Sequence, residues 1–261
     1  MPSIVEGYGG SEPLRKTNNH KKNVSDFLTK AIYRGELKPG ETVTEDWLSR
    51  SLNISRTPVR EALISLQAEG LIKMVNNRAT VTTITPVDIQ EIYEIRFLLE
   101  PYAARVCIGL IDKEQVRKIR DDTRRLLQQA GGDDPRRTTD LQTLIEEKTR
   151  EIRQSAQGLV KQAVENPEGD IHDIHDLIIE STRNQRLVTI TRNLQGQIRL
   201  LLNAAERIPG RIVQSMEEHL RLIDAILDDN REMAEAHMRT HIRTNMEDML
   251  NAANFRFIFK E

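Results

Sequence analysis

Hydrophobic residues recur three and four positions apart over much of the chain, which is the period of an amphipathic helix. The first such stretch predicts a helix over residues 22–34, with the apolar positions Val24, Phe27, Leu28, Ala31 and Ile32. A short second helix is expected after Thr44, whose hydroxyl can cap it. Its apolar side carries Trp47, Leu48 and Leu52.

A third helix is expected to begin with Thr57 as its N-cap and Pro58 as its first residue, and to end at Gly70. Its apolar stripe consists of Val59, Ala62, Leu63 and Leu66. The β-rich segments LIKMV and ATVTTI follow, separated by Asn76-Asn77-Arg78, and predict a hairpin. Three helices and a hairpin within about 65 residues indicate a winged helix-turn-helix.

From Thr85 onward the pattern is helical almost to the end of the chain, with Thr85 as a cap and Pro86 as the first residue of a helix that runs to residue 107. Gly131-Gly132-Asp133-Asp134-Pro135 marks an internal break. Further helices are expected over about 139–164, 171–183, 187–206, 211–228 and 231–253. The predicted fold is therefore mostly α: an N-terminal winged helix-turn-helix followed by an antiparallel all-α bundle of six to seven helices.

Three segments are expected along the chain: a disordered tail over 1–21, the winged helix-turn-helix over 22–84, and an all-α domain over 85–261. No stretch approaches the roughly 18 consecutive apolar residues that span a membrane, and the N-terminus lacks the apolar core of a signal peptide. The single cysteine, Cys107, excludes an internal disulfide framework and favours a buried, apolar role in a cytoplasmic protein.

The net charge of −2 is distributed unevenly. Residues 20–85 hold ten Lys and Arg against seven Asp and Glu, a net charge of +3, whereas residues 86–261 carry −5. The positive excess therefore falls where a nucleic-acid surface needs it.

The start of the third helix carries Arg56 and Arg60, one helical turn apart. Arginine suits this position because its planar fork binds guanine O6 and N7 bidentately, or holds a phosphate. Other side chains of this domain can add contacts to the DNA backbone, and these are Arg34, Thr44, Arg50, Thr57 and Arg78. We therefore expect double-stranded DNA as a partner, with the third helix in the major groove.

Residues 24–82 resemble the DNA-binding domain of GntR-type bacterial transcription regulators. The resemblance rests on AIYRGELKPGETVTEDWLSRSLNISRTPVREALISLQAEGLI and on NNRATV in the wing, and SRTPVREAL followed by EGL is its most specific part. It implies a homodimer that reads a short inverted repeat, with Arg56 and Arg60 as base-contacting positions. The chain departs from the family pattern at Ala79, where glycine is usual.

Five of the six histidines lie between residues 172 and 241, and three of them fall on separate predicted helices: His175, His219 and His241. Antiparallel helices can bring such positions together inside a bundle, and neutral imidazoles are good ligands for zinc or nickel. Spacing alone is equally compatible with hydrogen-bonded core histidines or surface histidines. His237, four positions before His241, is read as a surface residue.

The segments EIYEIRFLLEPYAA, IHDLIIESTRNQRL and SMEEHLRLIDAILDDNREMAEAHMRTHI resemble the FCD effector-binding domain of the FadR subfamily. The resemblance implies that His175, His219 and His241 bind a divalent metal. The usual fourth ligand, an aspartate one turn before the first histidine, is replaced by Ile171. Its place can be taken by the neighbouring Asp170 or His172, or by water.

A metal with three protein ligands keeps positions open for a small carboxylate effector, and nearby arginines can clamp that anion. The arginines expected to line the cavity are Arg96 and Arg199. The sequence thus favours a ligand-responsive transcription regulator, a repressor rather than an activator, and not an enzyme. Two alternatives remain: a metal-free regulator with an acyl-thioester or other arginine-held effector, and a metal-dependent enzyme joined to a DNA-binding domain.

Overall fold

The computed structural model describes residues 20–76, 78–129, 174–205, 208 and 210–254. The chain divides into two compact units, with a boundary between Thr85 and Pro86. Unit 1 comprises residues 1–85 together with 192–200, and unit 2 comprises the remainder. In the described part of the chain, no helix combines the length and apolar character needed to cross a membrane.

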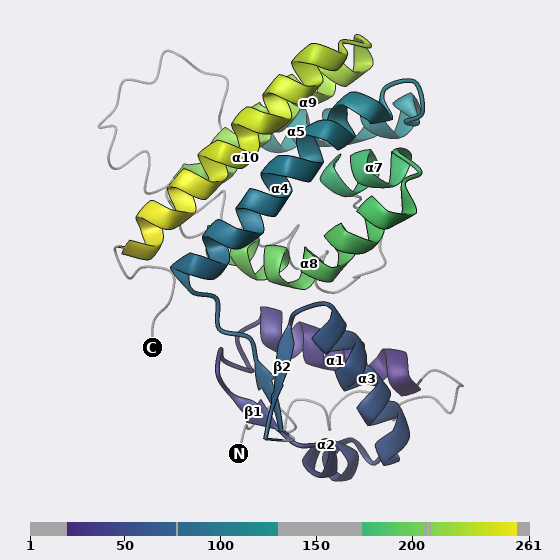
Figure 1. The fold of residues 1–261 in the computed structure, drawn as a ribbon, viewed down its shortest axis with the longest axis vertical. Helices are drawn as coiled ribbons and strands as arrows, with labels where there is room; N and C mark the ends of the chain where they lie inside the picture. The colour runs from purple at the N-terminus through teal and green to yellow at the C-terminus, as the bar shows by residue number, and fades with distance from the viewer. Residues whose placement is uncertain (1–19, 77, 130–173, 206–207, 209, 255–261) are drawn as a thin grey trace. The chain divides into compact units, whose positions relative to one another are not determined.

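Unit 1 contains three helices and a small sheet, shown in purple and blue in Figure 1. The helices are α1 (His20–Tyr33), α2 (Glu45–Leu52) and α3 (Arg56–Ala68). The strands are β1 (Thr42–Val43), β2 (Ile72–Val75) and β3 (Arg78–Val81). All pairings are antiparallel and the strand order is β1-β3-β2, so the predicted winged helix-turn-helix is confirmed.

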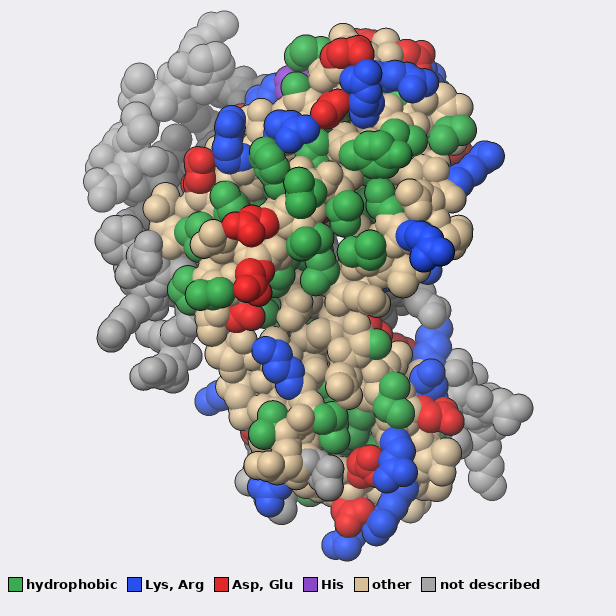
Figure 2. Space-filling view, in the orientation of Figure 1, with side chains coloured by type: hydrophobic (Ala, Val, Ile, Leu, Met, Phe, Trp, Pro, Cys, Tyr) green, Lys and Arg blue, Asp and Glu red, His purple; other side chains and the backbone are tan. Residues whose placement is uncertain are grey.

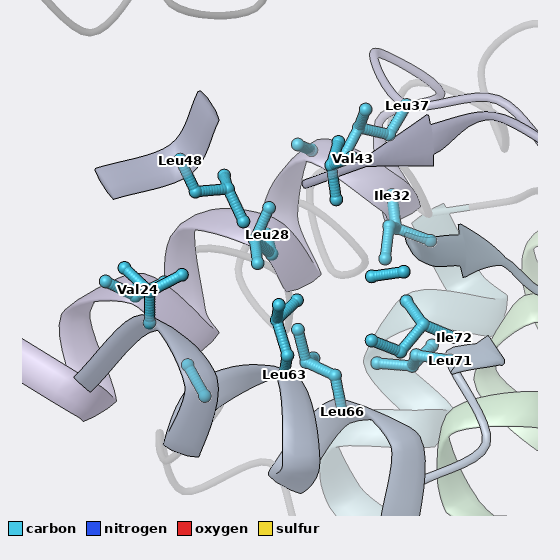
Figure 3. Close-up of a cluster of buried hydrophobic side chains, with 14 of the residues drawn as sticks. Val24, Leu28, Ile32, Leu37, Val43, Leu48, Leu63, Leu66, Leu71 and Ile72 are labelled. Atoms are coloured by element: carbon cyan, nitrogen blue, oxygen red, sulfur yellow. The ribbon is translucent and has the colours of Figure 1, made fainter. Parts of the chain in front are cut away.

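The apolar stripes of the three helices meet the inner face of this sheet in one core (Figure 3). Val24 and Leu28 of α1 and Leu66 of α3 are at most 1% exposed, and Leu48 of α2 is fully buried. Because α1 packs along α3 and α2 packs against α3, the third helix is supported on two sides. Its opposite face is left free, and Ile64 on that face is 59% exposed.

Two local predictions in unit 1 were wrong. Helix α3 begins two residues earlier than expected, at Arg56, with Ser55 in place of Thr57 as the N-cap. Ser55 makes no side-chain capping hydrogen bond, and the local pattern does not distinguish it from Thr57 as an N-cap residue. The wing is also larger than the predicted hairpin, since residues 42–43, which were not among the predicted strands, form β1 beside β3.

Unit 2 is an all-α bundle built around one long antiparallel pair (Figure 1). Its helices are α4 (Pro86–Cys107), α5 (Lys113–Gln129), α7 (Ile174–Ser181), α9 (Arg211–Leu227) and α10 (Arg231–Asn254), together with the two ends of α8 (Gln185–Ala205), whose residues 192–200 belong to unit 1. Helix α10 packs along both α4 and α9, while α7 packs against α4 and α5 against α9. Of the three helices that carry His175, His219 and His241, α7 and α10 therefore pack against α4, and α9 packs against α10.

The expected helices over 211–228 and 231–253 match α9 and α10 closely, and Cys107 is buried as predicted. Helix α5 was not among the expected ranges, although Val116, fully buried, and Ile119, partly buried, form its inward face. The tail over 1–19, the break at 131–135 and the helix over 139–164 lie outside the described residues.

Replacement of Leu66 by alanine is expected to destabilise unit 1 by about 2–5 kcal/mol, because a fully buried side chain would leave a cavity. The matched control is Ile64→Ala on the same helix, which should change the free energy of unfolding by less than about 0.5 kcal/mol. Chemical denaturation of both variants checks the prediction, and equal losses of stability would contradict the packing described above.

Candidate DNA interface and metal centre

The first turn of α3 presents two arginines to solvent. The side chains of Arg56 and Arg60 are 69% and 67% exposed, and they lie one turn apart on the face that the core of unit 1 does not use. The guanidinium groups therefore stand where a helix-turn-helix meets the edges of base pairs. Two exposed cations do not contribute to the packing of a core helix, but they can contact the base edges and phosphates of DNA.

Each of these arginines has an acidic partner at the start of α2. The Arg60 guanidinium donates to both carboxylate oxygens of Glu45, at 3.0 Å each. Arg56 Nε lies 3.0 Å from Asp46 Oδ1. Nothing in the local sequence pattern shows that Glu45 and Asp46 reach α3. These two ion pairs fix the directions of the Arg56 and Arg60 side chains, which stay exposed to solvent.

The other predicted DNA-binding residues are distributed around the same domain. Thr44 Oγ1 accepts a hydrogen bond from the backbone N–H of Trp47 at 3.2 Å, so this side chain caps α2. The remaining predicted residues are exposed: Arg34, Arg50, Thr57 and Arg78. Arg78 opens β3 at the turn of the wing, and Ala79 beside it is 1% exposed and faces the core.

Three histidines from three helices of unit 2 meet at one point. His175 of α7, His219 of α9 and His241 of α10 can each present one nitrogen, and these nitrogens all lie within 4.8 Å of one another. The Nε2 atoms of His175 and His219 are 3.0 Å apart, and those of His219 and His241 are 3.2 Å apart. His175 and His241 are buried, whereas His219 is partly exposed. The sequence prediction named these three residues, and the structure brings them together.

The orientation of His175 is fixed by a buried ion pair on α4. Its Nδ1 lies 2.5 Å from Glu100 Oε2, and Glu100 Oε1 in turn accepts from Arg96 Nε at 2.5 Å. Burial alone would raise the pKa of Glu100, but Arg96 and then His175 lower it to about 2. An ionised carboxylate only accepts hydrogen bonds, so Nδ1 of His175 carries a proton, and in the neutral ring Nε2 keeps its lone pair.

A second buried pair orients His241 in the same way. Glu218 Oε2 lies 2.7 Å from His241 Nδ1 and accepts from Arg211 NH2, also at 2.7 Å. Arg211 Nε donates to Asn245 Oδ1 at 3.0 Å, and Asn245 Nδ2 lies 2.9 Å from His241 Nε2. Burial, followed by the neighbouring histidines and arginines, lowers the pKa of His241 well below its usual value. The imidazole is therefore neutral at physiological pH.

The donor set fits a divalent transition metal. Nitrogens that share one tetrahedral zinc ion at about 2.0–2.1 Å stand about 3.3–3.4 Å apart, close to the separations observed here. Carboxylates that accept from Nδ1 are the usual outer partners of metal-binding histidines, since they turn Nε2 toward the ion. Among the described residues, the group of possible ligands contains three histidines and no carboxylate.

The remaining predicted site residues have different outcomes. Asp170, with Ile171 and His172, lies outside the described residues. Arg96 is beside the triad, but its guanidinium is bound to Glu100. Arg199 falls in the 192–200 part of α8, which belongs to unit 1 and not to the unit of the histidines.

Four residues that support the triad were not predicted: Glu100, Arg211, Glu218 and Asn245. The only local signal was the spacing of Asn245 four residues after His241, which places both on one face of α10. His237 is partly exposed and is not part of the triad.

Two family models match the chain. The model described as "Bacterial regulatory proteins, gntR family" matches residues 20–81. The FCD domain model matches residues 141–244, a range that includes all three histidines. The first match covers the helix-turn-helix and wing of unit 1, and the second covers most of the bundle from α7 to α10.

Relatives with similar sequences are DNA-binding regulators by name. The uncharacterized HTH-type transcriptional regulator YdhC of Bacillus subtilis (strain 168) is 40% identical over 90 residues, which are 34% of this chain and 40% of that protein. The gluconate operon transcriptional repressor of the same organism is 36% identical over 75 residues, 29% of this chain and 31% of the repressor. The similarity thus spans less than half the length of either relative.

A solved structure supports the fold over nearly the whole chain. A transcriptional regulator described as GntR from Rhodococcus sp. RHA1 superposes with a TM-score of 0.61 at 21% identity, covering 90% of this chain and 99% of that one. At this identity the likeness concerns the fold alone.

Arg60→Ala is expected to remove base discrimination of about 1–3 kcal/mol at one position of the preferred DNA site, because a bidentate guanidinium is lost. Selection from a random duplex pool, followed by sequencing of the bound fraction, measures this for the parent and the variant. Arg117→Ala, an exposed arginine of α5 in unit 2, is the matched control and should leave the selected motif unchanged. An identical motif with Arg60→Ala would exclude this side chain from base reading.

Proposed function

Because the chain belongs to the GntR family of bacterial regulators, in its FCD-containing FadR subfamily, we propose that it is a ligand-responsive repressor of transcription. It binds an operator through unit 1 and a small effector through unit 2. The observation that carries the proposal is the pairing, in one chain, of an exposed arginine pair on α3 with a buried histidine triad. The proteins that the chain matches are named as transcription regulators and not as enzymes.

The DNA-binding side of the proposal uses α3 as the reading helix. Arg56 and Arg60 exchange their carboxylate partners for guanine or phosphate, while Arg34, Arg50 and Arg78 contact the backbone. Since these pairs are exposed, they are worth little in solution and yield readily to DNA. Binding should fall steeply with salt, because every cation that meets a phosphate releases counterions. The operator is an inverted repeat read by a homodimer.

The effector side uses the triad. His175, His219 and His241 hold a divalent ion, zinc or nickel, through three Nε2 atoms. Such an ion attracts a carboxylate oxygen as a Lewis acid. Arg96 acts by holding Glu100 against His175, so it is a positioning residue rather than a clamp for the effector. Because the Arg96 guanidinium is bound to Glu100, the structure gives less support to the alternative in which an arginine, and no metal, holds the effector.

A second copy of the chain is the proposed partner of the outer face of α4. Figure 2 shows hydrophobic side chains gathered over this helix in unit 2. Ile95, Leu98 and Tyr102 lie on one face at helical spacing and are 40%, 68% and 51% exposed. Apolar residues grouped in this way mark protein interfaces. A helix that meets its own copy across a twofold axis covers the stripe on both chains at once.

Regulation follows if the effector favours one arrangement of the dimer. Differential affinity of the ligand for two arrangements shifts their populations, and the spacing of the two reading helices changes with them. The repressor assignment is supported by the gluconate operon relative, which carries that name.

Purified protein is expected to hold metal in near-stoichiometric amount, and a His175/His219/His241 triple-alanine variant is expected to hold none. Elemental analysis after dialysis, and again after incubation with zinc or nickel, measures both. His237→Ala removes a neighbouring histidine of α10 and should behave like the parent. Because the triple variant removes two buried rings, the partly exposed His219→Ala and a circular dichroism check guard against unfolding. Negligible metal in a folded parent would contradict the proposal.

The α4 stripe is expected to hold the dimer. Leu98→Asp or Tyr102→Asp places a charge in a desolvated interface and should raise the dimer dissociation constant by at least about tenfold. Sedimentation velocity over a range of protein concentrations measures the effect. Leu110→Asp, at a 43% exposed position after the end of α4, is the control. A dimer of unchanged strength in both α4 variants would place the interface elsewhere.

A further inference from the structure

The amide of Asn245 has one orientation, and it points a donor at the histidine triad. Asn245 is 4% exposed, and its Oδ1 accepts from Arg211 Nε at 3.0 Å. If the amide were reversed, two N–H donors would face each other, so Arg211 determines which end is nitrogen. The amide nitrogen therefore lies 2.9 Å from His241 Nε2.

Without metal, the hydrogen bonds of this centre are complete. His175 and His241 carry a proton on Nδ1, toward Glu100 and Glu218, so in the neutral rings both Nε2 atoms accept. His219 can donate from Nε2 to His175 Nε2 at 3.0 Å. Asn245 donates to His241 Nε2. The amide of Asn245 thus occupies the lone pair that a metal needs.

Metal binding leaves Asn245 without its acceptor. Once His241 Nε2 serves as a ligand, its lone pair can no longer accept from the amide. A buried N–H group without an acceptor is costly, and the geometry leaves Asn245 beside the ion with a donor to satisfy. A ligand that shares the centre with the ion can supply the new acceptor.

The charges around the triad indicate an anion. Arg96 is neutralised by Glu100 and Arg211 by Glu218, and all four side chains are at most 6% exposed. Asp248 adds a negative charge 3.1 Å from Arg211, but this carboxylate is 32% exposed and is screened by solvent. Histidine binds a metal as the neutral imidazole, so the two charges of a divalent ion have no buried counterpart among the described residues.

Resting on the proposed function above, we propose that Asn245 is the specificity residue for a carboxylate ligand and makes metal affinity depend on that ligand. A carboxylate has two oxygens, so it can give one to the ion and accept from the Asn245 amide with the other. Metal and carboxylate then bind cooperatively, since each supplies what the other leaves unsatisfied. The carboxylate ligand thus takes the place of the aspartate that the family pattern has at position 171, where this chain has isoleucine.

The experiment measures the affinity of demetallated full-length protein for Zn²⁺, by competition with a chromophoric chelator, in acetate or in perchlorate at equal ionic strength. The parent is expected to bind Zn²⁺ about tenfold more tightly in acetate. Asn245→Ala should lose this difference, because the amide donor is gone. Asn251→Ala, an exposed asparagine of the same helix, is the matched control and should keep it.

Asn245→Asp is the sharper variant. One of its oxygens can keep the bond to Arg211 Nε, and the other places a negative charge where the amide nitrogen stood. We expect tighter Zn²⁺ binding than in the parent and no dependence on acetate. The visible spectrum of the Co²⁺ form gives an independent readout, since acetate should alter it in the parent and not in Asn245→Asp. Circular dichroism of each variant confirms that the bundle is folded.

The outcomes separate the two proposals. A folded parent that binds no Zn²⁺ in either salt overturns the metal part of the proposed function, and this inference with it. A parent that binds Zn²⁺ equally in acetate and perchlorate overturns only the inference. The same holds if Asn245→Ala keeps the acetate effect, or if Asn245→Asp weakens Zn²⁺ binding.

Discussion

A positive charge can be buried only if a negative partner is buried with it, and the centre of unit 2 depends on meeting this constraint twice. Arg96 and Glu100 form one pair on α4, and Arg211 and Glu218 form the other on α9. Each carboxylate uses its remaining capacity on a histidine Nδ1. The same contacts that neutralise the arginines therefore set the tautomers of His175 and His241. The carboxylates of Glu100 and Glu218 thus neutralise the buried arginines and also orient the histidines that are proposed to bind the metal.

In unit 1, the arginine–carboxylate pairs between α3 and α2 are exposed rather than buried. The arginines stay in water, and Glu45 and Asp46 direct them without burying them. Exposed ion pairs of this kind contribute little free energy, which suits groups that must change partners. A buried version of the same pairs would stabilise the free protein and hinder its contact with DNA. The two units thus place arginine–carboxylate pairs in contrasting environments for contrasting purposes.

The sequence predicted what depends on local pattern and missed what depends on contacts between distant segments. The apolar stripes of α1 to α3 and the SRTPVREAL motif were sufficient for the winged helix-turn-helix, because neighbouring residues determine them. Glu100 and His175 are 75 positions apart, and no periodicity connects them. The start of α3 was misplaced because Ser55 and Thr57 are both favourable N-cap residues, and the local pattern does not distinguish them. Arg199 was expected to line the cavity because its helix was expected to border it, and the sequence pattern cannot tell which unit a stretch of α8 joins.

The position of Asn245 has an evolutionary consequence. A single transition in the first base converts either asparagine codon into an aspartate codon. In the network around Arg211, that one change would give the centre a fixed negative ligand of its own. A lineage with this bundle therefore stands one nucleotide away from a permanently loaded, structural metal centre. With the neutral amide in place, occupancy of the proposed metal centre depends on a carboxylate that the cell supplies.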